Sequence, residues 1–83
     1  MRKILIIGAG KSTAYLIKYL LDKSKSEDLH LIVGDISAQN AKKLVGNHPN
    51  AQAISLDVFN KQSRQDAIKN SDIVISMLPA HYH

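Results

Sequence analysis

Cysteine is absent from the 83-residue sequence. Its absence excludes a disulfide scaffold, a thiolate metal site and a cysteine nucleophile. It also fits a reducing compartment, so we expect a cytoplasmic location. Long apolar runs are absent too, since none approaches the roughly 18 residues that a membrane-spanning helix needs. The apolar run that follows Arg2-Lys3 ends at Gly8, which argues against a signal peptide, and we expect no membrane partner.

Aromatic residues are scarce, at 5% of the chain, and the basic residues that give a net charge of +4 are scattered. Single-stranded nucleic acids are bound by basic grooves interleaved with aromatic stacking platforms. We therefore interpret the lysines as solvated helix surface and expect no nucleic-acid partner. Apart from His81 and His83, the histidines lack metal-ligand spacing, and no metal site is expected. Neither a triad nor paired carboxylates occur, so we expect no catalytic residue in this segment.

Apolar runs alternate with stretches of helical periodicity, which is the pattern of βαβ units. Right-handed crossovers then predict an α/β fold, a partial Rossmann (doubly wound) fold whose four parallel strands lie in the order 3-2-1-4, with helices on both faces. A complete fold of this kind usually has about six strands. We therefore interpret residues 1–83 as the N-terminal part of a dinucleotide-binding domain, with the remainder absent. The predicted strands span about 3–7, 29–33, 53–56 and 72–77. The first predicted helix spans about 12–23. The second is capped by Ser37, and the residues that share its apolar face are Ala38, Ala41, Leu44 and Val45. The third is capped by Asn60 and runs to about Lys69.

The fourth strand has no predicted neighbour on its outer side, although Ile73, Val74 and Ile75 make it apolar. Exposed sheet edges tend to pair with other chains. The sequence therefore predicts self-association through this strand.

The glycine turn Gly8-Ala9-Gly10 directly follows the first apolar run. Gly8 suits a turn with positive φ, and Gly10 leaves room for backbone to approach a pyrophosphate at a helix N-terminus. Thr13 stands where the dinucleotide fingerprint has its third glycine. A phosphate-binding loop of the triphosphatase type is excluded, because it needs glycine where this chain has Leu5. The side chains expected at the phosphates, besides the turn itself, are Lys11, Ser12 and Thr13.

Asp35 closes the second apolar run, 25 positions after Gly10. A carboxylate there accepts hydrogen bonds from the adenosine ribose and repels a 2′-phosphate. No arginine follows it, since the next residues are Ile36 and Ser37. NAD is therefore favoured as cofactor, with NADP left possible. The alternative role for Asp35 is to cap the second helix.

Two further strand ends carry candidate binding residues. Asp57-Val58 follows the third strand, where the carboxylate can accept from the adenine amino group and Val58 can pack on the ring. The alternative for Asp57 is a turn residue. Residues 76–80 close the fourth strand at the topological switch point, where ligands bind in open α/β sheets. We expect their backbone near the nicotinamide ribose.

These motifs together resemble the N-terminal domain of saccharopine dehydrogenases, and Ser76-Met77-Leu78-Pro79-Ala80-His81-Tyr82-His83 is the most family-like piece. The resemblance implies an NAD- or NADP-dependent oxidoreductase of lysine metabolism that interconverts saccharopine with an amino acid and an oxo acid. It also implies that the acid–base residues lie in a second, substrate-binding domain outside this segment. The binding residues that it implies are Gly8, Ala9, Gly10, Lys11, Ser12 and Thr13 at the pyrophosphate, Asp35 at the ribose, Asp57 and Val58 at the adenine, and Leu78 and Pro79 at the nicotinamide.

The hypothesis from the sequence is thus a cofactor-binding segment of a saccharopine dehydrogenase-like oxidoreductase. Its partners are a dinucleotide and the substrate domain of the full-length chain, and the segment alone is expected to lack turnover. A non-enzymatic NAD-binding regulatory module is the alternative, because it would share the glycine turn and Asp35. A purely structural α/β module is a third hypothesis and predicts no cofactor binding.

Overall fold

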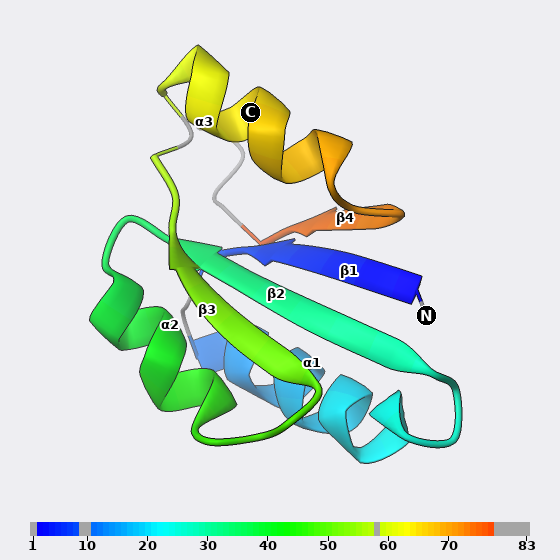
Figure 1. Ribbon diagram of the computed structural model, residues 1–83. Helices are drawn as coiled ribbons and strands as arrows, with labels where there is room; N and C mark the ends of the chain where they lie inside the picture. Colours follow the sequence, from blue (N-terminus) through cyan, green and yellow to red (C-terminus); the bar gives the residue numbers. More distant parts are fainter. Residues whose placement is uncertain (1, 9–10, 58, 78–83) are drawn as a thin grey trace.

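The computed structural model describes residues 2–8, 11–57 and 59–77, in which strands and helices alternate along the chain (Figure 1). The order of these strands and helices confirms the predicted βαβ pattern. Each boundary lies within about two residues of the one expected from sequence. The elements are β1 (Arg2–Ile7), α1 (Lys11–Ser24), β2 (Leu29–Asp35), α2 (Ala38–Val45), β3 (Ala51–Ser55), α3 (Lys61–Lys69) and β4 (Ile73–Ser76).

The described strands form one parallel sheet in the order β3-β2-β1-β4, as predicted. Strand β3 begins two residues earlier than expected, because Ala51 pairs with Leu31 of β2. Strand β2 continues through Asp35, which pairs with Ser55. The carboxylate residue is therefore the last residue of its strand, and its backbone position is set by the sheet.

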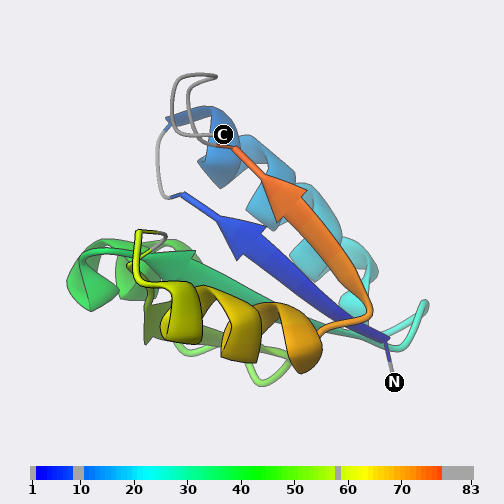
Figure 2. The same ribbon diagram turned by 90° about the horizontal axis from the view of Figure 1, so that it is seen from above.

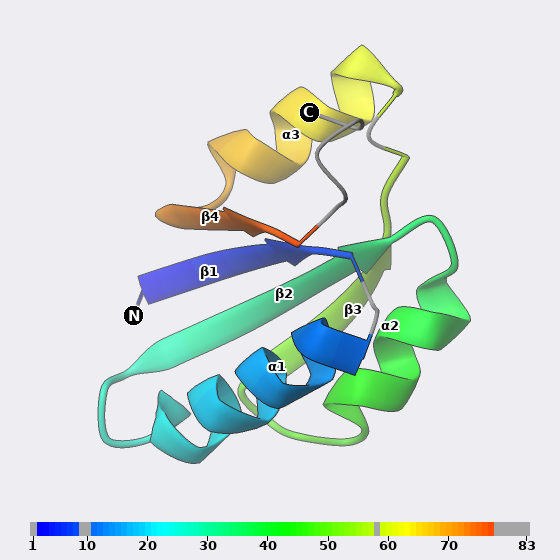
Figure 3. The ribbon, with the colours of Figure 1, turned by 180° about the vertical axis from the view of Figure 1, so that it is seen from behind.

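Helices α1 and α2 cover one face of the sheet (Figures 1 and 3). The apolar side chains on this face make the larger of two hydrophobic clusters among the described residues. Burial of each large aliphatic side chain contributes about 1.5–3 kcal/mol. The buried members of this cluster are Ile4, Ile6, Ile17, Leu29, Leu31, Val33, Ala41 and Val45.

Two details of this face were not expected from the sequence. The buried stripe of α1 includes Thr13 and Ser24, which are 2% and 1% exposed. Ser24 is satisfied there, since its Oγ donates to the Leu21 carbonyl at 2.8 Å and accepts from Asn50 Nδ2 at 3.2 Å. Ala38 was expected on the buried face of α2 but is exposed at the first residue of the helix.

The helix ends follow the predicted capping residues. Ser37 is the N-cap of α2, and its Oγ accepts from the Asn40 N–H at 3.3 Å. Asn60 is the N-cap of α3, and its Oδ1 accepts from the Ser63 N–H at 3.0 Å. Gly46 ends α2 with its N–H donating to the Lys42 carbonyl. Such caps satisfy backbone groups that a helix end leaves unpaired.

Helix α3 lies on the opposite face from α1, which places helices on both faces as predicted (Figure 2). This face buries Leu5, Ile7, Ile32 and Leu56, and Ala67 of α3 packs against them. No residue of α3 itself is buried. Among the described residues, no helix combines the length and apolar character needed to cross a membrane.

Strand β4 is a sheet edge, because among the described residues it pairs with β1 alone. Ile73 is 41% exposed and Val74 is 40% exposed. The expectation of an exposed apolar edge is confirmed.

Candidate dinucleotide-binding site

Three of the residues predicted for the site, Gly8, Asp35 and Asp57, lie at the carboxyl edge of the sheet, because all of the paired strands run parallel. The Gly8 N–H donates to the Gly34 carbonyl at 2.8 Å, which joins the end of β1 to β2. The Leu56 N–H donates to the Asp35 carbonyl at 2.8 Å, which joins β2 to the residue after β3. Gly8, Asp35 and Asp57 therefore follow three neighbouring strands at one edge, where ligands bind in open α/β sheets.

Gly8 has the conformation that the glycine turn requires. Its φ is 107°, a value that residues other than glycine rarely adopt, and the residue is buried. Helix α1 begins at Lys11, three residues later, so the strand passes into a helix N-terminus as expected. Ala9 and Gly10, and the side chains of Lys11 and Ser12, lie outside what the structure describes.

Thr13 lies in the first turn of α1 with 2% of its surface exposed. The position normally taken by glycine for close helix–strand packing is therefore filled by a side chain packed inside the fold. This burial favours a packing role for Thr13 over a phosphate contact. Its hydrogen bond to a phosphate stays a prediction.

Gly34 is a second glycine of this edge, and the sequence motifs did not single it out. A Cβ there would meet Leu56 Cδ2 at 3.0 Å and Leu56 Cβ at 3.1 Å. The neighbouring Leu56 is 3% exposed and has little space to move. Gly34 thus allows Leu56 to pack directly beneath the strand that ends in Asp35.

The Asp35 carboxylate is half-buried and forms a turn with the start of α2. Its Oδ2 accepts from the Ser37 N–H at 3.0 Å. The alternative capping role is therefore present in the structure. No hydrogen bond joins Oδ1 to any other described residue, and a carboxylate oxygen can accept more than one hydrogen bond. The capping bond is compatible with a bond from a ribose hydroxyl.

Asp57 has a similar arrangement after β3. Its Oδ1 accepts from the Phe59 N–H at 3.0 Å, and its carbonyl accepts from the Asn60 N–H at 3.0 Å. The expected turn role is thus seen here too, with the side chain exposed. Its contact with adenine stays a prediction, and Val58 lies outside the described residues.

Two exposed apolar side chains flank these carboxylates and were missed by sequence reasoning. Ile36 is 73% exposed directly after Asp35, and Phe59 is 72% exposed two residues after Asp57. A signal was present in the sequence, because each is a large apolar residue in a short connection between a strand and a helix. Only Val58 was expected from the sequence to make an apolar contact with the adenine ring.

The end of β4 reaches the same edge, where the Met77 N–H donates to the Ile7 carbonyl at 2.9 Å. Leu78 and Pro79, the residues expected at the nicotinamide, lie outside the described residues. The part of the chain that is described also holds no group of three or more side chains suited to bind a metal.

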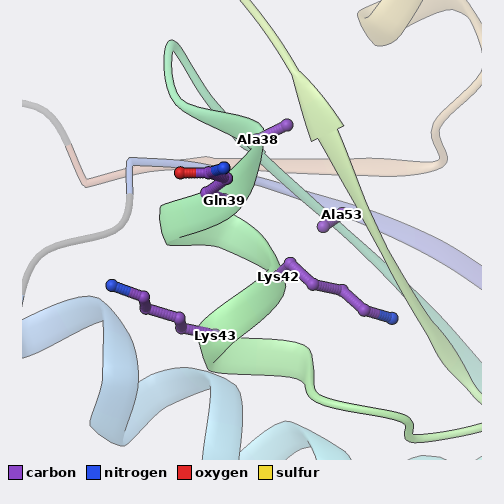
Figure 4. Close-up of a pocket in the computed structure, with 5 residues that line it drawn as sticks. All are labelled: Ala38, Gln39, Lys42, Lys43 and Ala53. Atoms are coloured by element: carbon purple, nitrogen blue, oxygen red, sulfur yellow. The ribbon is translucent and has the colours of Figure 1, made fainter.

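A separate depression of about 500 Å³ lies between α2 and β3 (Figure 4). None of the predicted binding residues lines it. Figure 4 shows Lys42 extending past β3 and Lys43 extending toward α1. The residues lining this depression are Ala38, Gln39, Lys42, Lys43 and Ala53.

The parallel sheet, the positive-φ glycine at the end of β1 and the carboxylate at the end of β2 define a dinucleotide-binding α/β domain. The model of the saccharopine dehydrogenase NADP-binding domain family matches residues 4–83. The chain belongs to that family. The membership confirms the expected resemblance and the expectation of a nicotinamide dinucleotide cofactor, for which both NAD and NADP had been considered.

Two curated proteins are similar to the chain over a small part of their own length. It is 29% identical to a saccharopine dehydrogenase (NADP⁺, L-glutamate-forming) of Schizosaccharomyces pombe over 83 residues, which is 100% of this chain and 18% of that protein. It is 32% identical over 62 residues to an alpha-aminoadipic semialdehyde synthase of Arabidopsis thaliana, covering 75% of this chain and 6% of that protein. The chain thus spans less than a fifth of the length of either relative.

Two solved structures share the fold. Apo saccharopine dehydrogenase (L-Glu forming) from Saccharomyces cerevisiae superimposes with a TM-score of 0.88 at 26% identity, over 100% of this chain and 18% of that chain. A dTDP-glucose 4,6-dehydratase from Bacillus anthracis, in complex with NAD, superimposes with a TM-score of 0.72 at 21% identity, over 98% of this chain and 28% of that chain. The second likeness concerns the fold alone.

Proposed function

We propose that this chain binds the adenosine diphosphate part of a nicotinamide dinucleotide at the carboxyl edge of its sheet. The observation that carries the proposal is the pair formed by Gly8, at φ 107°, and the Asp35 carboxylate on adjacent strands. Gly8 opens the turn that leads to the N-terminus of α1, where backbone N–H groups and the helix dipole favour a pyrophosphate. Asp35 accepts from the ribose.

The remaining binding roles follow from position along this edge. We propose that Asp57 accepts from the adenine amino group and that the ring packs on the exposed Ile36 and Phe59, which follow the same strand ends. Val58 and the turn residues Ala9, Gly10, Lys11 and Ser12 keep the roles expected from the sequence. Leu78 and Pro79 are proposed to lie beside the nicotinamide, because the fourth strand ends at the switch point of the sheet.

The whole protein is proposed to be an NAD(P)-dependent oxidoreductase of the saccharopine dehydrogenase type. Residues 1–83 would form the N-terminal part of its cofactor domain, and a second domain would supply the substrate site and the acid–base residues. The cofactor supplies hydride transfer at a C–N bond, and this segment holds and orients it. Relatives named for this enzyme and for a semialdehyde synthase support the enzyme over a regulatory module.

The test of binding is the thermal unfolding of the chain with and without cofactor. A ligand that binds only the native state raises the melting temperature at concentrations well above its dissociation constant. We expect this rise for the native chain and its loss in Gly8→Val, because the substitution forces a side chain into a positive-φ turn. An unchanged melting temperature of the native chain at high NAD and NADP concentration would contradict the proposal and favour a purely structural module.

The matched control is Gly46→Ala. Gly46 also has a positive φ, of 58°, but it ends α2 and a Cβ there meets open space. The Gly46→Ala variant should lose stability, because alanine also disfavours a positive φ, but its melting temperature should still rise when cofactor is added. The enzyme proposal is tested separately by following reduction of the cofactor by the full-length gene product with saccharopine. Cofactor binding without any such turnover would favour the regulatory module.

We also propose that the isolated chain self-associates through β4, where Ile73, Val74 and Met77 are between 36% and 41% exposed. Unpaired apolar edges favour pairing with another copy. In the longer protein, the same edge is available to the rest of the cofactor domain. The cytoplasmic location stays a prediction.

A further inference from the structure

The turn that carries Asp35 is held by hydrogen bonds on both sides. The Asp35 carbonyl accepts from the Leu56 N–H at 2.8 Å, and the Ile36 carbonyl accepts from Ser55 Oγ at 3.3 Å. Both bonds tie the turn to the end of β3. On the other side, the carboxylate Oδ2 accepts from the Ser37 N–H at 3.0 Å. The carboxylate is therefore fixed at the strand end.

The start of α2 strengthens the same arrangement. The Ser37 Oγ accepts from the Asn40 N–H at 3.3 Å, and the Ser37 carbonyl accepts from the Ala41 N–H at 3.3 Å. If the carboxylate rotated away, the Ser37 N–H would lose its partner at a half-buried position. Leaving such a donor unpaired is unfavourable. The turn thus resists the rearrangement that would make room for a second anion.

The residues that follow Asp35 in the sequence supply no cation beside its carboxylate. Residues 36–41 contain neither lysine nor arginine. The first cations of α2 are Lys42 and Lys43, which lie a full turn beyond the N-cap. Lys42 extends past β3 and Lys43 toward α1, so neither reaches back toward the start of the helix (Figure 4). Asp35 is thus the charged residue nearest in sequence to Ser37, the N-cap of α2.

We infer that this chain selects NAD over NADP, which departs from the cofactor named for its family and for its fission-yeast relative. The inference rests on the proposed function, because it assumes that the ribose lies at Asp35. NADP would bring a 2′-phosphate of nearly two negative charges against the fixed carboxylate, whereas the 2′-hydroxyl of NAD donates a hydrogen bond to it. The selection is thus made by one charge in a turn that cannot easily move.

The experiment is calorimetric titration of the native chain and of Asp35→Asn with NAD and with NADP. Asparagine keeps the shape and a carbonyl oxygen for the Ser37 N–H but removes the charge. We expect the native chain to bind NAD on the order of tenfold or more tightly than NADP, and the variant to bring this ratio close to one. Asp35→Ser, which retains an acceptor oxygen, serves as a second variant if Asp35→Asn does not fold.

Asp22→Asn is the matched control, since Asp22 is exposed on α1 and the substitution changes the net charge equally. It should leave the NAD-to-NADP ratio of the native chain unaltered. The inference is overturned if the native chain binds NADP as tightly as NAD, or if Asp22→Asn shifts the ratio as much as Asp35→Asn. Binding of neither dinucleotide by a folded native chain would instead overturn the proposed function, and the inference with it.

Discussion

The two faces of the sheet differ in how completely helices cover them. On the face of α1 and α2, the side chains of β1 and β2 form a continuous buried cluster with Ile17, Ala41 and Val45. On the face of α3, the strands are buried, but no side chain of α3 is. Next to α3, β4 leaves Ile73 and Val74 about two-fifths exposed. Strands β1 and β2, with helices α1 and α2, are thus the tightly packed part of the molecule.

This difference explains where the candidate site lies. Gly8 follows β1 and Asp35 ends β2, the two central strands, and hydrogen bonds to Gly34 and Leu56 hold them in position. A binding site that must keep a carboxylate still gains from rigid surroundings. The α3 and β4 side contributes apolar surface that the described chain does not cover. In the proposed longer protein, this is the surface available to the rest of the cofactor domain.

The largest difference between the two faces of the sheet is expected in the free energy of unfolding, when one isoleucine of a helix on each face is replaced by alanine. Ile17→Ala removes a side chain that is 1% exposed, and we expect a loss of about 2–4 kcal/mol in the free energy of unfolding. Ile68→Ala on α3 removes a side chain that is 43% exposed and should cost less than about 1 kcal/mol. Chemical denaturation measures both. Equal losses would show that α3 is packed as firmly as α1.

A smaller effect is expected at the helix caps. Ser37→Ala removes an N-cap from a helix packed on the core and should lower the free energy of unfolding by about 1 kcal/mol. Asn60→Ala removes the N-cap of α3, which has no buried residue, so the helix can fray locally with less effect on global unfolding. Hydrogen exchange of the α3 amides should show this fraying. A larger global loss for Asn60→Ala would reverse the comparison.

Self-association through the edge strand β4 can be tested by a substitution that changes the free energy of unfolding very little. Val74→Lys places a charge on the exposed apolar edge, and we expect dimers or larger species to dissociate while the free energy of unfolding changes by less than about 1 kcal/mol. The control is Gln52→Lys on β3, the other edge strand of the sheet. Sedimentation velocity distinguishes the species. A native chain that is monomeric at high concentration would refute self-association.

Sequence reasoning predicted the strand order, the caps at Ser37 and Asn60, and the positive φ of Gly8. These features depend on local patterns and on the handedness of crossovers, which the chain itself specifies. The burial of Ser24 could not be predicted in this way, because its hydroxyl accepts a hydrogen bond from a residue distant in the sequence, Asn50. The burial of Thr13 likewise depends on how α1 packs in the fold. Strand β3 began earlier than expected, because its register depends on pairing with β2.

At the site, the sequence identified the carboxylate of Asp35 but left its ribose and capping roles as alternatives. The structure shows that a capping bond to Ser37 uses one oxygen and holds the group in place. Spacing alone could not reveal this combination, because it depends on the geometry of the turn. Gly34 was overlooked for a related reason, since its role comes from a neighbour on the next strand, Leu56.

The most direct test of the central claim is an amide chemical-shift titration of the isotope-labelled chain with NAD. We expect the signals of Gly8, Gly34, Asp35 and Ile36, at the carboxyl edge, to shift together along one binding curve. Signals at the opposite edge, such as those of Asp28 and Asn50, should remain in place. Shifts confined to that opposite edge, or to the depression beside Lys42, would contradict the account, as would an unchanged spectrum of the folded chain at saturating NAD.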